Sequence, residues 1–156
     1  MVEANDEHLR IRRAGPVDAT AVRALTRAAY AKWVPLIGRE PTPMAADYEA
    51  AVCRHMIDLL MVETELVALI ETVRVADHLL IENVAVSPPC QHLGYGRLLL
   101  AHAERLAADL GVATVRLYTN QKFASNLELY RRLGYVVDRE EQFWGGCKVH
   151  MSKRVA

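Results

Sequence analysis

Cysteine is scarce in this sequence, its hydrophobic runs are short, and neither sign of charge is in excess. The three cysteines, Cys53, Cys90 and Cys147, match neither the spacing of a zinc site nor a CxxC motif, and their number is odd. We interpret them as reduced thiols of a cytoplasmic protein. Residues 1–10 are polar and lack the hydrophobic segment of a secretion signal. No apolar run approaches the roughly 20 residues that span a bilayer, so we expect no membrane partner.

The balance of charge argues against nucleic acid as a partner. Lys and Arg together number 19, as do Asp and Glu, so the formal net charge at pH 7 is +0. Phosphate binding needs a clustered basic excess, which this composition does not offer. Five of the six histidines are scattered along the domain without the spacing of metal ligands, so no metal is predicted. They are His55, His78, His92, His102 and His150.

The length of 156 residues favours one domain, which we place at residues 8–156 after a short polar extension, 1–7. Hydrophobic periodicity and turn signals predict an α/β (α+β) fold, with a mixed, mostly antiparallel seven-stranded sheet flanked by four helices. Asp18 is the expected cap of the first helix. The links at 64–65 and 76–77 are too short for a parallel crossover, so antiparallel pairing is expected there. Strands are predicted at 8–13, 59–62, 66–75, 78–86, 114–119, 135–138 and 147–153, helices at 18–30, 42–58, 97–110 and 124–133, and an apolar loop at 32–43.

A turn with two glycines separates the strand at 78–86 from the helix at 97–110. Gly94 and Gly96 lack Cβ atoms, so another group can approach the backbone closely. Free N–H groups and the helix dipole make an anion site at a helix start, and a pyrophosphate is a natural occupant. The same glycines also suit a tight turn alone. A Rossmann fingerprint would need a third glycine where Leu99 stands, and the Gly-Lys-Ser/Thr of a P-loop is absent.

Three segments, in the same order, resemble motifs of the GNAT acyltransferase superfamily. Residues 80–86 (Leu-Ile-Glu-Asn-Val-Ala-Val), then Ser-Pro and Gln91-x-x-Gly94-x-Gly96, resemble its central motif. Residues 126–135 resemble its second motif, and residues 148–153 resemble its last strand. The resemblance covers nearly the whole chain. It implies a splayed GNAT sheet and an acetyl-CoA-dependent N-acetyltransferase whose acceptor is a primary amine of a small molecule or peptide. Dimers are common in the family, so it also favours a homodimer.

The resemblance implies a binding site for coenzyme A. The backbone of residues 84–86 would pair with the pantetheine arm as an added strand, and the amides of residues 93–97 would hold the pyrophosphate. Gln91 would add a side-chain donor. Asn126 would reach the pantetheine, and Asn120 is the weaker candidate for that contact. The expected contacts are Val84, Ala85, Val86, Gln91, His92, Leu93, Gly94, Tyr95, Gly96, Arg97 and Asn126.

Two residues are candidate catalytic groups. Tyr130 matches the family tyrosine near the thioester sulfur, and it shares a helix face with Asn126 four residues before it. A phenol with a pKa of about 10 can protonate a thiolate whose thiol has a pKa near 8.5, so Tyr130 is the predicted general acid. Glu82 alternates with Val84 along the strand and is the predicted base, whereas Asn83 points to the other face. The alternatives are a core aromatic for Tyr130 and a solvated carboxylate for Glu82.

The acceptor side of the cleft is expected over the segment 30–48. Trp33 and Tyr48 are aromatic candidates for a pocket that binds an amine, and Glu40 is a candidate for attracting a cation. Packing of this segment onto the sheet is an equal alternative. Trp144 would close the same cleft or contribute to a dimer contact. Two other functions remain open, a module that binds acyl-CoA as a sensor without turnover and a homodimeric scaffold with a vestigial cleft.

Overall fold

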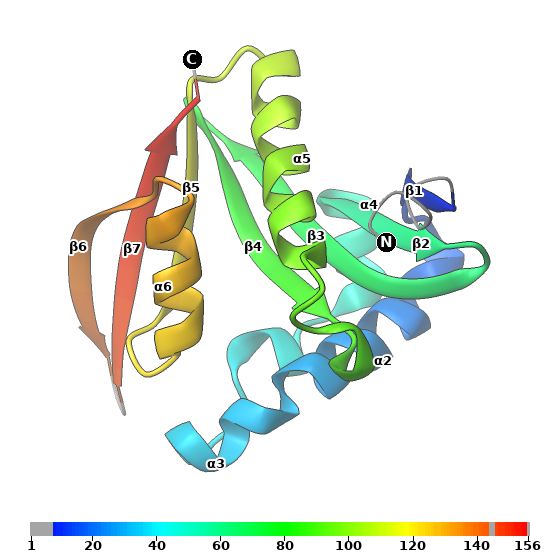
Figure 1. Cartoon of the computed structure of the whole chain (residues 1–156), viewed down its shortest axis with the longest axis horizontal. Helices are drawn as coiled ribbons and strands as arrows, with labels where there is room; N and C mark the ends of the chain where they lie inside the picture. Colours follow the sequence, from blue (N-terminus) through cyan, green and yellow to red (C-terminus); the bar gives the residue numbers. More distant parts are fainter. Residues whose placement is uncertain (1–7, 144–145, 156) are drawn as a thin grey trace.

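One mixed sheet forms the framework of the computed structural model, which describes residues 8–143 and 146–155. The strand order is β1-β2-β3-β4-β5-β7-β6 (Figure 1). Strands β4 and β5 pair in parallel, and the other neighbours pair antiparallel. The seven-stranded sheet that was predicted is therefore confirmed. The strands are β1 (Leu9–Arg13), β2 (Met56–Val62), β3 (Glu65–Val75), β4 (His78–Val86), β5 (Thr114–Asn120), β6 (Val136–Phe143) and β7 (Gly146–Arg154).

Helices cover both faces of this sheet. Helices α2 (Ala19–Tyr30) and α4 (Tyr48–Arg54) pack with one set of buried residues, and α5 (Tyr95–Asp109) and α6 (Ala124–Arg132) pack with the other. Strand β2 supplies both sets, because side chains alternate across a strand. Leu59 and Met61 are buried with α2 and α4, whereas Leu60 is buried with α5 and α6. The shorter helical pieces are η1 (Pro16–Asp18), η2 (Ala31–Trp33), α3 (Val34–Ile37), η3 (Thr42–Ala45) and η4 (Pro88–Cys90).

The sheet splays apart between β4 and β5. Their parallel pairing runs only from His78↔Thr114 to Ile81↔Leu117, and the two strands diverge beyond it (Figure 1). The pairing of β3 with β4 shifts at the same level, from Glu71↔Asn83 to Thr72↔Ile81, which leaves Glu82 as the extra residue of a β-bulge. A bulge bends a strand and increases its twist. The last five residues of β4, 82–86, therefore have no ladder partner on β5.

The bulge also interrupts the alternation that was expected along β4. Before it, Leu79 and Ile81 are buried in the core beneath α5. After it, Val84 and Val86 pack against that same core, although simple alternation would place odd and even residues on opposite faces. Ala85 lies instead in the core beneath α2 and α4. Because Glu82 is an extra residue, the odd-numbered residues face α5 before the bulge and the even-numbered residues face it afterwards.

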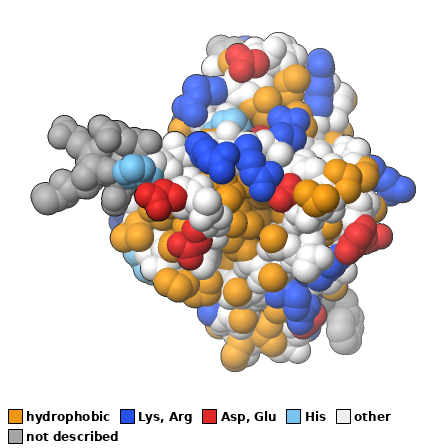
Figure 2. All heavy atoms as spheres, turned by 90° about the vertical axis from the view of Figure 1, so that its right-hand side faces the viewer, with side chains coloured by type: hydrophobic (Ala, Val, Ile, Leu, Met, Phe, Trp, Pro, Cys, Tyr) orange, Lys and Arg blue, Asp and Glu red, His pale blue; other side chains and the backbone are white. Residues whose placement is uncertain are grey.

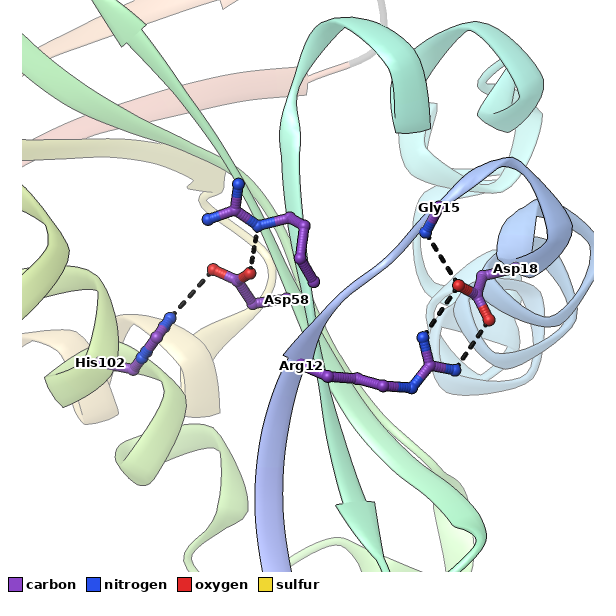
Figure 3. Close-up of polar contacts among 6 residues, drawn as sticks. Arg12, Gly15, Asp18, Asp58 and His102 are labelled. Carbon is purple, nitrogen blue, oxygen red and sulfur yellow. Dashed lines mark hydrogen bonds and ion pairs between the residues drawn. The ribbon is translucent and has the colours of Figure 1, made fainter.

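A buried carboxylate ties α5 to the far edge of the sheet. Asp58 of β2 is 3% exposed; it accepts a hydrogen bond from Arg13 Nε at 2.6 Å and lies 2.9 Å from His102 Nε2 of α5 (Figure 3). Burial opposes the charge of Asp58, but the hydrogen bonds from His102 and Arg13 outweigh it and lower the pKa of this carboxyl. Asp58 therefore anchors α5, whose first residues belong to the glycine turn, to β1 and β2.

The first predicted helix begins where expected, but its cap is different. Asp18 does not bond to the amides of α2. Its carboxylate accepts the Gly15 N–H at 2.8 Å and two hydrogen bonds from the Arg12 guanidinium (Figure 3). The side chain therefore closes the preceding turn η1 and joins it to β1. The prediction missed this because the arginine that competes for the carboxylate lies on another element.

The second predicted helix, 42–58, was placed incorrectly. Residues 42–45 form the turn η3, Ala46 is extended, and the Asp47 carboxylate caps the short helix α4 by accepting the Ala50 N–H at 3.1 Å. Residues 56–58 belong to β2, because they pair with β3. The predicted loop 32–43 also contains the helical pieces η2 and α3. The turn predicted at 64–65 lies one residue earlier, where Glu63 has a φ of +57°.

Several other boundaries differ by a few residues. Helix α5 begins at Tyr95, two residues before the prediction, and β6 continues to Phe143 instead of ending at 138. Among the described residues, no helix is long and apolar enough to cross a membrane. Seen from the side on which β1 and α4 lie, the molecule gathers hydrophobic side chains in the centre of the view, with charged side chains of both signs around them (Figure 2).

Candidate functional site

The glycine turn places amide groups at the start of α5. Gly94 directly precedes the helix and has a φ of +89°, a left-handed conformation that suits glycine. The Leu98 N–H donates to the Gly94 carbonyl at 3.1 Å. The amides of residues 95–97 precede that bond and have no acceptor within the helix. Since they also lie at the positive end of the helix dipole, the turn has the chemistry of an anion site.

A cavity of about 420 Å³ lies beside this helix start, and we call it the glycine-turn cavity. Its walls come from the end of β4, the turn and first residues of α5, the segment around Trp33, and one face of α6. Ten of the eleven residues expected to contact coenzyme A line it, while Leu93 is 64% exposed and does not. The structure therefore gathers on one groove residues that the sequence places in three separate segments.

Gln91 joins the turn to β4 and to the segment after α2. Its Nε2 donates to the Val86 carbonyl at 3.1 Å, and its Oε1 accepts from Lys32 Nζ at 3.0 Å. The Lys32 ammonium also lies 4.9 Å from the centre of the Trp33 ring, which stacks on Phe123 at 4.4 Å. Lys32 thus adds a positive charge to the cavity that already has the free amides. The sequence gives no signal for this role of Lys32, because the residue is 59 positions from Gln91.

A second cavity, of about 390 Å³, adjoins the opening between β4 and β5, and we call it the carboxylate cavity. Glu82 lines it, together with Glu71 from β3. Glu71 is 6% exposed, and its Oε2 lies 2.6 Å from Nδ1 of His55. Burial raises the pKa of Glu71, although His55 works in the opposite direction, and the nearby charge of Glu82 raises it further. Two carboxylates, one of them deeply buried, therefore face the same space.

Tyr130 lies where the two cavities meet. It lines both, as do Tyr30, Val84 and Asn126. Burial raises the pKa of Tyr130 to about 12, so its phenol stays protonated at neutral pH. Asn120, the weaker candidate for the pantetheine contact, lines only the carboxylate cavity. A proton donor is thus held between a groove suited to an anion and a cavity with carboxylates.

Asn83 connects the elements around the place where the two cavities meet. The residue is 3% exposed; its Oδ1 accepts the Tyr30 hydroxyl at 2.9 Å, and its Nδ2 lies 3.1 Å from Thr26 Oγ1 and 3.4 Å from the Tyr48 hydroxyl. A buried amide is stable when its hydrogen bonds are satisfied. Asn83 therefore fixes α2 and α4 against β4 beside the opening, a role that the sequence did not reveal.

The residues predicted for the acceptor lie in three different places. Tyr48 is fully buried, with its hydroxyl donating to the Pro43 carbonyl at 2.7 Å, and it lines the carboxylate cavity. Trp33 lines the glycine-turn cavity instead. Glu40 is exposed and forms an ion pair with Arg27 at 2.7 Å. Trp144 lies outside the described residues.

Several residues of the carboxylate cavity were not predicted at all. They include Glu71, whose position on an apolar strand was the available signal, and His55, which was treated as one of five scattered histidines. Lys148 and Arg39 also line this cavity. No group of three or more His, Cys, Asp or Glu side chains that could hold a metal ion occurs in the described part of the chain.

The sequence matches the family model described as "Acetyltransferase (GNAT) family" over residues 22–135. This match spans most of the chain and includes both the glycine turn and Tyr130. The protein therefore belongs to the acetyltransferase (GNAT) family, as its motifs predicted. A search of curated proteins found no match to the sequence.

Solved structures of similar fold include several acetyltransferases. The ribosomal-protein-S18-alanine N-acetyltransferase of Escherichia coli is 22% identical, with a TM-score of 0.77 over 95% of this chain and 94% of the other. The PaiA N-acetyltransferase of Thermoplasma acidophilum, in complex with coenzyme A, is 17% identical, with a TM-score of 0.79 over 94% and 98% of the two chains. YncA of Salmonella typhimurium, a putative acetyltransferase with acetyl-CoA, is 15% identical, with a TM-score of 0.74 over 95% and 94%. At these identities the likeness shows the fold.

Proposed function

We propose that this protein transfers an acetyl group from acetyl-CoA to a primary amine of a small molecule or peptide. The observation that carries the proposal is the position of Tyr130, which lines both the glycine-turn cavity and the carboxylate cavity. A thioester held in the first cavity would have its leaving sulfur beside this phenol, with the second cavity open to the attacking amine. Membership of the GNAT family supports the donor, and similar structures are complexes with coenzyme A or acetyl-CoA.

The glycine-turn cavity suits coenzyme A in its charge and its backbone. The amides of residues 95–97 and the Lys32 ammonium would hold the pyrophosphate. Residues 84–86 line the cavity beyond the last pair of the β4–β5 ladder, so their backbone can pair with the pantetheine as an added strand. A Cβ at Gly96 would fill the space beside Val86, at 3.9 Å from its side chain, so the glycine leaves that space to a ligand.

Two proton transfers complete the reaction. The amine attacks in its neutral form, and we assign to Glu82, which lies in the bulge at the opening, the removal of the proton that the nitrogen loses on becoming an amide. The C–N bond forms as the C–S bond breaks, and the Tyr130 hydroxyl donates its proton to the departing thiolate. A phenol with a pKa of about 12 is a weak acid, but a thiolate in a buried site is also a stronger base than in water. When the N-acetylated product and coenzyme A have left, Glu82 gives its proton to solvent and the Tyr130 phenolate takes one up, which restores both groups.

Two measurements test the proposal in sequence. Thermal unfolding with and without acetyl-CoA should show a higher midpoint with the ligand, because a ligand that binds only the folded state stabilises it. An assay of thiol release over polyamines, amino acids, aminoglycosides and peptides with free N-termini should then find at least one acceptor. If acetyl-CoA binds but no amine in the panel is acetylated, the protein is an acyl-CoA sensor and not an enzyme. Absence of binding would favour the scaffold with a vestigial cleft.

A further inference from the structure

The carboxylate cavity carries opposite charges on two parts of its wall. Glu71 and Glu82 lie on β3 and β4, beside the opening where Tyr130 meets the cavity. Arg39, from the segment after α3, and Lys148, from β7, also line it. These two cations both lie against the ring of Phe143: the Arg39 Cζ is 5.2 Å and the Lys148 Nζ is 5.7 Å from its centre. The aromatic ring therefore brings together two positive charges from distant parts of the chain.

The neighbouring carboxylates of these two cations are bonded to other groups. Glu40 follows Arg39 but forms its ion pair with Arg27 at 2.7 Å, and the Arg39 guanidinium donates to the Glu40 carbonyl at 3.4 Å. Glu141 lies opposite Lys148 on β6, yet its Oε1 lies 2.8 Å from His150 Nε2. Among the residues that the structure describes, neither Arg39 nor Lys148 forms an ion pair within 4.0 Å.

Tyr118 lines the same cavity beside both charged parts. The Lys148 Nζ lies 4.7 Å from the centre of its ring. Burial raises the pKa of the Tyr118 phenol, and the charge of Glu82 is the next largest cause, so this carboxylate lies near the hydroxyl. Tyr118 is therefore the side chain beside both charged parts, and the cavity of about 390 Å³ that they line can hold one small bifunctional molecule.

We propose that the acceptor is an amine that also carries a carboxylate, with its amine directed towards Glu71 and Glu82 and its carboxylate held between Arg39 and Lys148. This inference rests on the proposed function and names its substrate class. Arginine and lysine bind carboxylates by charge-assisted hydrogen bonds. A polyamine would instead bring a second positive charge towards Arg39 and Lys148, which is unfavourable in a partly buried site. The walls formed by Phe143 and Tyr118 would exclude water from both charged contacts.

Matched pairs of acceptors isolate the carboxylate. Thiol release is measured with L-amino acids and dipeptides, with their C-terminal carboxamides, and with spermidine. For the best acceptor, kcat/KM should exceed that of its carboxamide by about ten-fold or more, the range expected for a charged hydrogen bond. Equal rates for acid and amide, or a preference for spermidine, would overturn the inference while leaving the acetyltransferase intact.

Two variants and a matched control locate the binding of the carboxylate. Lys148→Met and Arg39→Met should each raise KM for the acid with little change in kcat, and should leave KM for the carboxamide unchanged. Lys122→Met removes the same charge from an exposed residue outside the cavity, and it should change neither constant. An equal rise in KM for acid and amide in the two cavity variants would contradict a contact with the carboxylate.

A binding measurement separates this inference from the proposed function. Thermal shift of the protein loaded with coenzyme A is compared for N-acetyl-amino acids and for their carboxamides. Stabilisation by the acids alone, reduced in Lys148→Met, supports the carboxylate site even if no acceptor is turned over. Stabilisation by neither set, together with turnover of amines that lack a carboxylate, rejects the site and keeps the enzyme. Stabilisation by neither set and no turnover rejects both.

Discussion

The two cavities on either side of Tyr130 are built in different ways. The glycine-turn cavity takes most of its lining from one stretch, residues 84–97, and much of its chemistry is backbone. The carboxylate cavity takes charged side chains from β3, β4, β7 and the segments around α3 and α4. A contiguous backbone site depends on local geometry, whereas a site assembled from distant side chains depends on the whole tertiary structure. The difference separates the site that neighbouring residues build from the site that long-range packing builds.

The largest expected effect is at the boundary between the two cavities. Tyr130→Phe should lower kcat by about ten-fold or more, since the thiolate loses its proton donor, while acetyl-CoA affinity is nearly kept. Tyr135→Phe is the matched control: its ring centre is 6.0 Å from that of Tyr130, and its buried hydroxyl has no hydrogen-bond partner among the described residues. Steady-state kinetics and acetyl-CoA titration measure both variants. Unchanged turnover in Tyr130→Phe would remove it from the mechanism.

The next effect belongs to the carboxylate cavity alone. Glu82→Gln should lower kcat/KM for the acceptor by about ten-fold near neutral pH, because the amine loses its base, and acetyl-CoA affinity should not change. Glu128→Gln provides a surface control, since that carboxylate pairs with Arg132 on the exposed side of α6. The pH profile of kcat/KM is the measurement. If Glu71→Gln lowers kcat/KM more than Glu82→Gln does, the base is Glu71, the carboxylate bonded to His55.

A smaller effect should be confined to the glycine-turn cavity. Gly94→Ala places a Cβ on a residue with a φ of +89°, which costs about 1–2 kcal/mol and shifts the amides that follow. Acetyl-CoA should bind several-fold more weakly, with kcat at saturation nearly kept. Gly111→Ala imposes the same strain at the other end of α5, where φ is +75° and the space is open. Titration calorimetry and thermal unfolding should show equal destabilisation but weaker binding only in Gly94→Ala.

The smallest effect concerns the alkaline side of the pH profile, where kcat should not fall through ionisation of Tyr130. The general acid acts while protonated, and burial raises the pKa of Tyr130 to about 12. Its protonated form therefore persists well above neutral pH, and kcat should show no descending limb due to Tyr130 up to about pH 10. Stopped assays at saturating substrates, with stability checked at each pH, measure this. A limb near pH 9 that disappears in Tyr130→Phe would show that the phenol ionises more easily than its burial indicates.

Sequence reasoning reached further on the donor side than on the acceptor side. The strand, the turn and the helix start follow one another in the chain, so their spacing was enough to predict the groove around Gly94 and the helix that carries Tyr130. The four-residue spacing between Asn126 and Tyr130 placed both on one helix face, and both line the glycine-turn cavity. These features depend on local geometry, which the periodicity of a helix or strand determines.

The acceptor side depends on contacts between residues far apart in sequence. His55, at the end of α4, meets Glu71 of β3, and Lys148 of β7 meets Tyr118 of β5. The bulge at Glu82 left no mark on the pattern of apolar residues, although it exchanges the faces of β4. Asp18 was assigned a local role as a helix cap, but Arg12 and Gly15 take its carboxylate.

By itself, the sequence determined the class of fold, the family and the glycine turn with its anion chemistry. It did so because alternation, helix spacing and glycine geometry act between residues a few positions apart. Only the tertiary structure decided that Glu71, Glu82, Arg39 and Lys148 line one cavity. Sheet order and the splay of β4 from β5 bring these charges together, and long-range packing sets both.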